Sequence, residues 1–400
     1  MKRIFQNFGK VVLAIALVAA AGCRKEDTLR FLPGENGEPS DYEVVDAAVN
    51  ASAEPSGIYL VNQGNQGSNK ARLDFLNFHN GFYIRDVFTE YNPEVVKGLG
   101  DTGNDVQVYK GKVFVAVNGS HKVEIMDAYS MKRLAQVDIP NCRFIAFDGN
   151  HAYVTSYVAK DTKDKEAFKT QKGALYRIDL DTYKVTGQVT VGYQPEQLVI
   201  RDGKAYVANS GGFFASSGVI GAKYDNTVSV VDLKSMKVEY NIEVAVNLEL
   251  MLVDAEGTIW VSSRGNYIDV SSTLNYLVKK GDKYELGGSV NVPVSSMALA
   301  GDKIYVIGTT YNPTTWEPTT TYNIVNVKTR ELESGSFITD GTESGITKAF
   351  TVTVNPGNGD IYVTDAKDYV SSGTLHCYTG SGKHKWSVRT GDIPGRIAFL

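Results

Sequence analysis

A short phrase recurs seven times along the chain and constrains its fold more than any other feature. Each copy has a tight turn, then an aromatic residue inside an apolar run, then Asn, Ser, Thr or Asp. The aromatic residues are 39 to 57 positions apart and are Tyr59, Phe114, Tyr153, Tyr206, Trp260, Tyr305 and Tyr362. A repeat of roughly 40–50 residues made of short strands is typical of a propeller blade. The pattern therefore predicts an all-β fold, a seven-bladed β-propeller.

The repeating unit is clearest at residues 196–246, which contain four strand-like runs joined by turns such as Asp202-Gly203. The first unit begins at Gly57 with its second strand and lacks a first strand. The final residues 396–400, RIAFL, match the missing strand. We therefore expect the C-terminal strand to join blade one and close the ring, which leaves no free sheet edge. A two-sheet sandwich of seven irregular hairpins is the alternative.

The first 22 residues are typical of a lipoprotein signal peptide. A basic start is followed by the apolar run 11–22, which is too short to span a membrane, and Cys23 comes directly after it. We expect Cys23 to carry the lipid, although an ordinary secretory signal with a chance Cys is the alternative. A Lys and two acidic residues within 24–27 resemble the export signal of some Gram-negative surface lipoproteins. They favour an outer-membrane protein anchored by lipid on the cell surface over one on the periplasmic face.

The rest of the chain divides into two predicted parts. Residues 23–56 are rich in Pro, Gly, Ser and acids and are expected to be a lipidated flexible tether, and residues 57–400 hold the propeller. Loss of the three cations of the signal peptide takes the formal charge from −4 to −7. A mildly acidic protein without basic runs argues against nucleic acid as a partner. The two further cysteines, Cys142 and Cys377, are expected to be unpaired.

Insertions are concentrated on one predicted face. The hairpins between first and second strands are minimal, whereas the loops joining second to third strands are long and rich in aromatic residues. Binding surfaces are usually built from such loops. The aromatic residues expected on this face are Tyr91, Tyr157, Phe213, Phe214, Tyr224, Tyr267, Tyr311, Trp316 and Tyr369.

Polar side chains should converge over the axis of the ring, at second-strand ends and at the junctions between blades. Planar aromatics among amides and guanidinium groups suit a large, flat, amide-rich ligand or a protein partner. Each Asn also fits a turn that satisfies its own loop, and each Arg also fits an ion pair between blades. The predicted ligand-binding residues are Asn62, Asn104, Arg143, Tyr193, Gln194, Asn209, Asn247, Arg264 and Tyr267.

The sequence lacks the motifs that are typical of catalytic sites. The five histidines have no metal-ligand spacing, no Ser lies in a nucleophile elbow, and no phosphate-binding loop is present. We therefore expect no catalytic residue, no metal and no catalytic cofactor, and a protein that is not an enzyme.

The repeats resemble the YVTN-type propellers often labelled surface-layer proteins, and within them the BtuG family of surface-exposed cobalamin-binding lipoproteins. The passages that carry the resemblance lie within residues 57–267 and include LVNQGNQGSNKARLDF, YNPEVVKGLGDTGND, DIPNCRFIAF, VTVGYQPEQLVI, KAYVANSGG, EVAVNLEL and VSSRGNY. The resemblance implies capture of cobalamin and related corrinoids on the loop face. It also implies docking on a TonB-dependent outer-membrane cobalamin transporter of the BtuB type.

Two other classes of function stay open at the level of the sequence. One is a propeller enzyme of the lyase or dehydrogenase type, and the other is an adhesive or structural surface protein. The residues alone also do not separate a corrinoid from a heme, a siderophore or a glycan.

Overall fold

The computed structural model describes residues 41–47, 55–158, 170–212, 215, 223–312, 315 and 317–400. Every described residue belongs to one compact unit, Ser40–Leu400. The predicted signal peptide, Cys23 and most of the tether lie outside the described residues. Three aromatic residues of the predicted binding face, Phe213, Phe214 and Trp316, also lie outside them.

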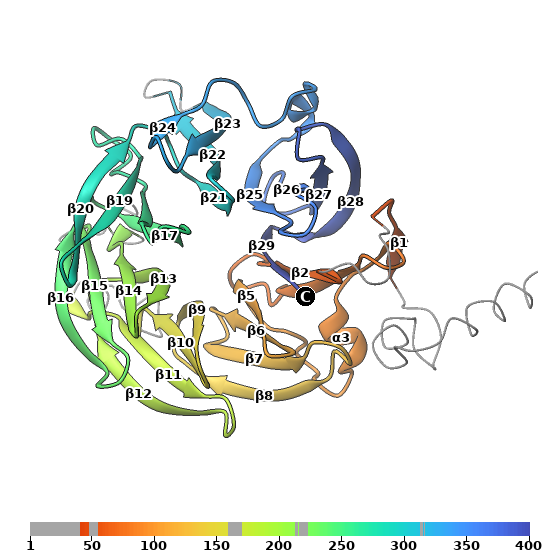
Figure 1. Cartoon of the computed structure of the whole chain (residues 1–400). Coiled ribbons are helices and arrows are strands. Elements are labelled where there is room, and N and C mark those ends of the chain that lie inside the picture. The colour runs from red at the N-terminus through yellow and green to blue at the C-terminus, as the bar shows by residue number, and fades with distance from the viewer. Residues whose placement is uncertain are drawn as a thin grey trace, which may run out of the picture. The chain divides into compact units, whose positions relative to one another are not determined.

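Within Ser40–Leu400, seven antiparallel sheets follow one another around a ring (Figure 1), so the fold is a seven-bladed β-propeller. In blades two to seven the four strands are consecutive in sequence, and the first strand of each lies innermost. The first three of these blades consist of β5 (Gly103–Tyr109), β6 (Lys112–Val117), β7 (Lys122–Asp127) and β8 (Arg133–Asp138); β9 (Cys142–Asp148), β10 (His151–Ser156), β11 (Ala174–Asp179) and β12 (Lys184–Thr190); and β13 (Pro195–Arg201), β14 (Lys204–Asn209), β15 (Thr227–Asp232) and β16 (Lys237–Glu243).

Blades five to seven repeat this order, and among the described residues two short helices accompany the sheets. The helices are α3 (Val87–Tyr91), between blades one and two, and the 3₁₀ helix η1 (Thr342–Gly345), before blade seven. The strands are β17 (Leu248–Val253), β18 (Ile259–Ser263), β19 (Thr273–Lys280) and β20 (Lys283–Val290); β21 (Ser296–Ala300), β22 (Lys303–Tyr311), β23 (Pro318–Asn326) and β24 (Glu331–Leu332); and β25 (Ala349–Val354), β26 (Ile361–Asp365), β27 (Ser372–Tyr378) and β28 (His384–Asp392).

Blade one confirms the predicted closure of the ring. Its innermost strand is the C-terminal β29 (Pro394–Phe399), which pairs with β2 (Gly57–Asn62), so that Tyr59 lies opposite Ala398. The next strands are β3 (Arg72–Asn77) and β4 (Phe82–Ile84). One sheet thus contains both ends of the propeller, and unfolding either end must break the contact between the first and last blades.

A fifth strand, β1 (Tyr42–Val44), extends blade one within the segment that the sequence assigns to the tether. Tyr42 stacks on Phe82 of β4 with ring centroids 5.1 Å apart, and Arg85 forms salt bridges with Asp41 and Glu43 on either side of it. Three residues are too short for a periodic pattern, so only pairing with β4 makes this stretch a strand. The two buried cysteines, Cys142 and Cys377, are free thiols, as expected.

The seven aromatic residues of the repeat all lie in second strands, and all are buried. Several reach a turn or a neighbouring blade: Tyr59 Oη donates to the Ala128 carbonyl at 2.8 Å, and Trp260 Nε1 donates to Asp254 Oδ2 at 2.9 Å. A buried aromatic ring fills the space between sheets, and its polar tip still needs a hydrogen-bond partner. The repeated phrase is thus a packing unit that joins each blade to its surroundings.

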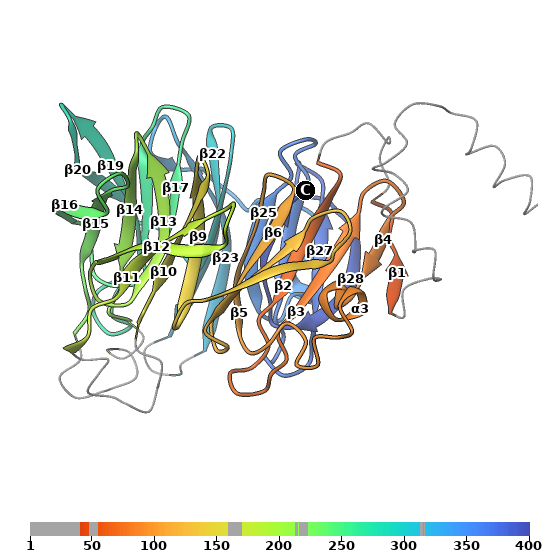
Figure 2. The ribbon, with the colours of Figure 1, turned by 90° about the horizontal axis from the view of Figure 1, so that it is seen from below.

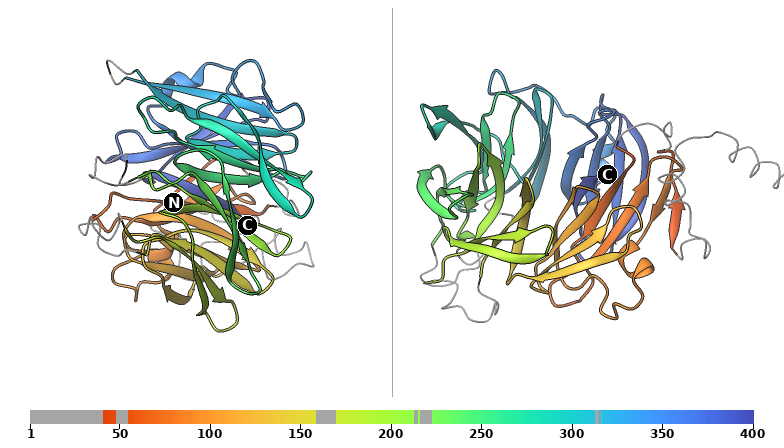
Figure 3. Two further views of the ribbon diagram at one scale, coloured as in Figure 1. Left: turned by 90° about the vertical axis from the view of Figure 1, so that its left-hand side faces the viewer. Right: turned by 60° about the horizontal axis from the view of Figure 1, so that its bottom comes forward.

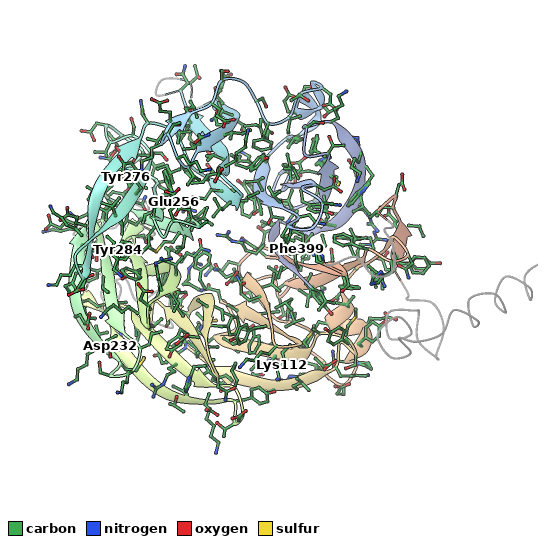
Figure 4. The ribbon with its side chains drawn as sticks, in the orientation of Figure 1. Lys112, Asp232, Glu256, Tyr276, Tyr284 and Phe399 are labelled. Atoms are coloured by element: carbon green, nitrogen blue, oxygen red, sulfur yellow. The ribbon has the colours of Figure 1, made fainter. Side chains whose placement is uncertain are left out.

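The two faces of the ring differ in construction, and the strands cross from one face to the other (Figures 2 and 3). One face carries the tight hairpins between first and second and between third and fourth strands. Lys112, Asp232 and Glu256, labelled in Figure 4, come from this hairpin face. The opposite face, called here the loop face, carries the starts of the inner strands and the ends of the second strands.

Candidate functional site

A cavity of about 400 Å³ opens on the loop face, where the inner strands begin. Six of the seven blades contribute side chains to its wall, and blade four is the exception. The lining residues are Gln63, Thr102, Asn104, Arg143, Phe144, Glu249, Arg264, Tyr267, Ser272, Val294, Ser295, Ser296, Thr309, Tyr311, Lys348, Ala349, Phe350, Thr351, Tyr369, Gly395 and Arg396.

β-Bulges at the beginning of the inner strands place several of these residues. The pairing between first and second strands slips by one residue at Asn104 in blade two, at Arg143 and Phe144 in blade three, at Glu249 in blade five and at Phe350 in blade seven. A bulge bends its strand and re-aims a side chain, and it interrupts the hydrogen-bond ladder. The inner strand therefore gives up regular pairing at the position where it meets the cavity.

Hydroxyl groups on the second strands repair the interrupted ladder. Phe144 N donates to Thr155 Oγ1 at 3.0 Å, Leu250 N donates to Ser262 Oγ at 2.8 Å, and Thr351 N donates to Thr364 Oγ1 at 2.9 Å. A buried N–H without a partner is costly, so these bonds stabilise the bulges. The Ser and Thr of the repeated phrase have this local structural role in blades three, five and seven.

Arg143 is held by an ion pair with Glu196, which occupies the corresponding bulge of blade four. Its Nε and Nη2 donate to Glu196 Oε2 at 3.0 and 2.8 Å, and its guanidinium carbon lies 4.9 Å from the ring centroid of Tyr157. Tyr157 Oη donates to the other oxygen of Glu196. The pair joins blades three and four, while Arg143 still lines the cavity.

Arg264 forms a similar pair within blade five. Its Nε and Nη2 donate to the two oxygens of Glu249, which is buried, while the Arg264 side chain is 41% exposed. Burial raises the pKa of the Tyr267 hydroxyl, and hydrogen bonds with Arg264 and Asn247 oppose that rise. The three residues therefore form one contact group on the wall of the cavity.

Two further cations line the cavity without a salt bridge to any described residue. Lys348 directly precedes β25, and its Nζ lies 5.6 Å from the ring centroid of Tyr369. Arg396 lies on β29, and its guanidinium carbon is 5.1 Å from the ring centroid of Phe144. Burial raises the pKa of Asp105 to about 6, against the opposing effect of Arg396.

Four of the nine predicted residues line the cavity: Asn104, Arg143, Arg264 and Tyr267. The other five lie near the loop face but outside the wall. Gln194 and Asn247 are buried in left-handed conformation, with φ of 47° and 59°, directly before β13 and β17. Thr102, Asn141 and Ile393 hold the same conformation directly before β5, β9 and β29. These five positions form the turns that lead into the inner strands. Two of them are Asn, which tolerates the left-handed conformation better than most residues.

The remaining three predicted residues also lie outside the wall. Asn62 is fully buried, and neither its Nδ2 nor its Oδ1 has a hydrogen-bond partner among the described residues, although its amide opposes the rise in pKa that burial imposes on Asp74. Asn209 donates to Thr227 and Ser229 and accepts from Gly192 N. Tyr193 binds Asp225 through its backbone N–H and lies 5.7 Å from Lys172 Nζ. Asn209 thus satisfies the backbone and neighbouring side chains, and neither Asn62 nor Asn209 lines the cavity.

The predicted ligand-binding residues include none from blades six and seven, although Tyr311 and Tyr369 were expected on the loop face. Phe350 occupies the bulge of blade seven that corresponds to the bulge of Arg143 and of Glu196, so aligning the repeats on that position would have found it. Lys348 lies two residues before Phe350. Three tyrosines of the wall remain exposed, and so do aliphatic residues close to them in the chain. Tyr267 and Tyr311 are each 47% exposed, Tyr369 is 37% exposed, and Ile268, Val270 and Val370 lie beside them in sequence. We call these six residues the apolar rim.

Within the part of the chain that the structure describes, no group of three or more His, Cys, Asp or Glu side chains could hold a metal ion. None of the described helices is long and apolar enough to cross a membrane.

In comparisons with known proteins, neither a family model nor a curated sequence matches the chain. Solved structures do match. A quinonprotein alcohol dehydrogenase-like protein of Bacteroides thetaiotaomicron is 14% identical, with a TM-score of 0.54 over 87% of this chain and 79% of that one. The periplasmic gluconolactonase of Pseudomonas aeruginosa is 11% identical, with a TM-score of 0.55 over 86% and 99%. A protein of unknown function from Desulfotomaculum acetoxidans is 12% identical, with the same score and coverage. At such identities the likeness concerns the propeller fold alone.

Proposed function

We propose that this protein is a non-enzymatic surface lipoprotein that captures cobalamin and related corrinoids on its loop face. The observation that carries the proposal is the axial cavity, which combines guanidinium and amide donors in its wall with an apolar rim of tyrosines around its mouth. A corrinoid has the matching chemistry, since it is a broad plate surrounded by amide side arms and carries a nucleotide tail.

The size of the cavity suggests how such a ligand would lie. Cavities of about 300–1,000 Å³ enclose drug-sized ligands, and a corrinoid is larger than a cavity of about 400 Å³ can enclose. The plate would therefore lie across the mouth against Tyr267, Tyr311 and Tyr369, while one part of the ligand enters between the arginines. Rigid strands hold most of these groups in advance, which lowers the ordering cost of binding.

The two glutamates beside the cavity arginines are occupied by hydrogen bonds, which supports a binding site rather than a catalytic one. Glu249 accepts two hydrogen bonds from Arg264, and Glu196 accepts from both Arg143 and Tyr157. A general acid or base must exchange its proton with a substrate, whereas carboxylates held in this way chiefly position the guanidinium groups. An enzyme of the lyase or dehydrogenase type remains the alternative that a binding test must address.

Transfer of the ligand to a TonB-dependent outer-membrane transporter is part of the proposal and rests on the resemblance of residues 57–267 to the BtuG family. Lipid attachment at Cys23 would hold the propeller at the outer membrane, and the acidic residues after it would direct it to the cell surface. The cavity and the apolar rim lie on one face of the ring, so a transporter that receives the ligand would meet this face.

Titration calorimetry with cyanocobalamin tests the proposal. We expect saturable binding at one site, and the coloured ligand should stay with the protein through a desalting column. Tyr311→Ala should weaken binding by about ten-fold, because stacking of an aromatic side chain on a flat ligand contributes about 1–3 kcal/mol. Tyr129→Ala, on the hairpin face, is the matched control and should bind like the wild type. Failure of the wild-type protein to bind cyanocobalamin would exclude the proposed ligand.

A further inference from the structure

The charged side chains of the cavity are unevenly compensated. Arg143 and Arg264 each use their Nε and Nη2 edge on a carboxylate, whereas Lys348 and Arg396 form no salt bridge with a described residue. Of the three neighbouring carboxylates only Glu249 belongs to the wall, because Glu196 and Asp105 lie outside it. The wall itself therefore carries four cations and one acid.

Lys348 and Arg396 come from adjacent blades. Lys348 directly precedes the inner strand of blade seven, and Arg396 lies on the inner strand of blade one, which the end of the chain supplies. Gln63 also lines this side of the cavity, and a side chain at Gly395 would approach its Cγ to 3.0 Å. Glycine at this position keeps space beside the Gln63 amide, next to Arg396 in the chain.

Arg396 also lies near another cation of the wall, Arg143. The guanidinium carbons of Arg396 and Arg143 lie 5.1 and 5.9 Å from the centroid of the same ring, that of Phe144. The pKa of Arg396 is lowered, first by burial and also by Arg264 and Arg143, and the attraction of Asp105 and Glu249 does not offset this. An anion bound here would supply the compensation that the protein itself leaves incomplete.

We infer that Lys348 and Arg396 form an anion subsite between blades seven and one, which binds the phosphodiester of the ligand. The inference rests on the proposed function and deepens it, because the phosphodiester of a cobalamin joins its corrin side arm to its nucleotide tail. The entry of this group into the cavity would orient the plate over the apolar rim. Guanidinium and ammonium groups are the usual partners of phosphate oxygens in proteins.

The test compares cyanocobalamin with dicyanocobinamide, a corrinoid that lacks the phosphodiester and the nucleotide. Lys348→Met and Arg396→Gln should each weaken cyanocobalamin binding by about ten- to a hundred-fold, as expected for loss of a charged hydrogen-bond donor. They should change cobinamide binding by less than about three-fold. Arg396→Lys should restore most of the affinity, and Lys383→Met, on the hairpin face, controls for the change in net charge.

Each outcome separates the subsite from the proposed function. Variants that weaken both corrinoids equally, or neither, would overturn the subsite and leave cobalamin capture standing. A wild-type protein that binds no corrinoid would refute the proposed function, and the subsite would then be judged with inorganic phosphate. We expect wild-type protein to broaden the ³¹P resonance of phosphate and Lys348→Met to abolish the effect, while equal broadening by both proteins would overturn the subsite.

Discussion

Removal of Arg143 should destabilise the propeller as well as any ligand complex. The Glu196 side chain is 6% exposed and that of Arg143 is 20% exposed, so Arg143→Ala leaves an almost buried carboxylate without its counter-charge. Breaking one side of a buried ion pair costs about 3–5 kcal/mol. Tyr157 still donates to Glu196, and some water can enter from the cavity. We therefore expect a loss near the lower end, about 3 kcal/mol of unfolding free energy.

The double variant Arg143→Met with Glu196→Gln provides the matched comparison. It removes both charges, keeps an acceptor for Tyr157 and fills a similar volume, so we expect it to lose about 1 kcal/mol or less. Urea unfolding at pH 7, followed by circular dichroism and tryptophan fluorescence, measures both variants. A single variant that loses less than about 1 kcal/mol, or a double variant that loses as much as the single one, would contradict the argument.

The comparison also determines how binding data at this position are to be interpreted. If Arg143→Ala lowers corrinoid affinity and the double variant does not, the loss reflects a disturbed site wall. If both variants lose affinity while the double variant stays stable, Arg143 contacts the ligand through the part of its guanidinium that Glu196 does not use. The same logic applies to Arg264 and Glu249, which form the corresponding pair in blade five.

Four further predictions concern other parts of the molecule. Deletion of residues 396–400 should cause a large cooperative loss of thermal stability, since β2 and the contact between the first and last blades become exposed; a melting temperature equal to that of the full chain would refute closure. Burial raises the pKa of Asp105 to about 6, so the folded wild-type protein should lose unfolding free energy as pH rises from about 4 to 6 and this carboxyl ionises. Asp105→Asn cannot ionise, so its unfolding free energy, measured with urea, should rise relative to that of the wild type by up to about 3 kcal/mol across that pH range. Burial also raises the pKa of both thiols, Cys142 and Cys377, to about 12, so iodoacetamide at pH 8 should label them only after unfolding. Cys23→Ala should move the protein from the membrane to the soluble fraction, and persistent membrane association would count against lipid anchoring.

Local sequence patterns were sufficient to predict the fold. Each of the patterns used can be recognised within a few consecutive residues: the seven aromatic residues, the tight hairpins and the terminal fragment RIAFL. Together they predicted the number of blades and the strand that closes the ring. The short strand β1 was not predicted, because its three residues become a strand only by pairing with β4, some forty positions further along the chain.

The candidate site was predicted in part. The sequence located the loop face and four residues of the cavity wall, since the positions of Asn104, Arg143, Arg264 and Tyr267 follow from where strands begin and end. It also proposed Gln194, Asn209 and Asn247, whose residue type fits an amide-binding pocket equally well. In the structure these three lie outside the cavity wall: Gln194 and Asn247 stand in left-handed turns, and the side chains of Asn209 and Asn247 donate hydrogen bonds to neighbouring groups.

What the sequence determined by itself is therefore the periodic framework: seven blades, a joined first and last strand, and one face with long loops. What the tertiary structure alone decided is which side chains face the axis and which charges are compensated. Bulges at the inner strands turn single residues toward the cavity, and ion pairs form between residues 15 and 53 positions apart, Arg264 with Glu249 and Arg143 with Glu196. Orientation and ion pairing depend on neighbours from other strands and blades, so no local pattern in the chain could reveal that Lys348 and Arg396 form no salt bridge with a described residue.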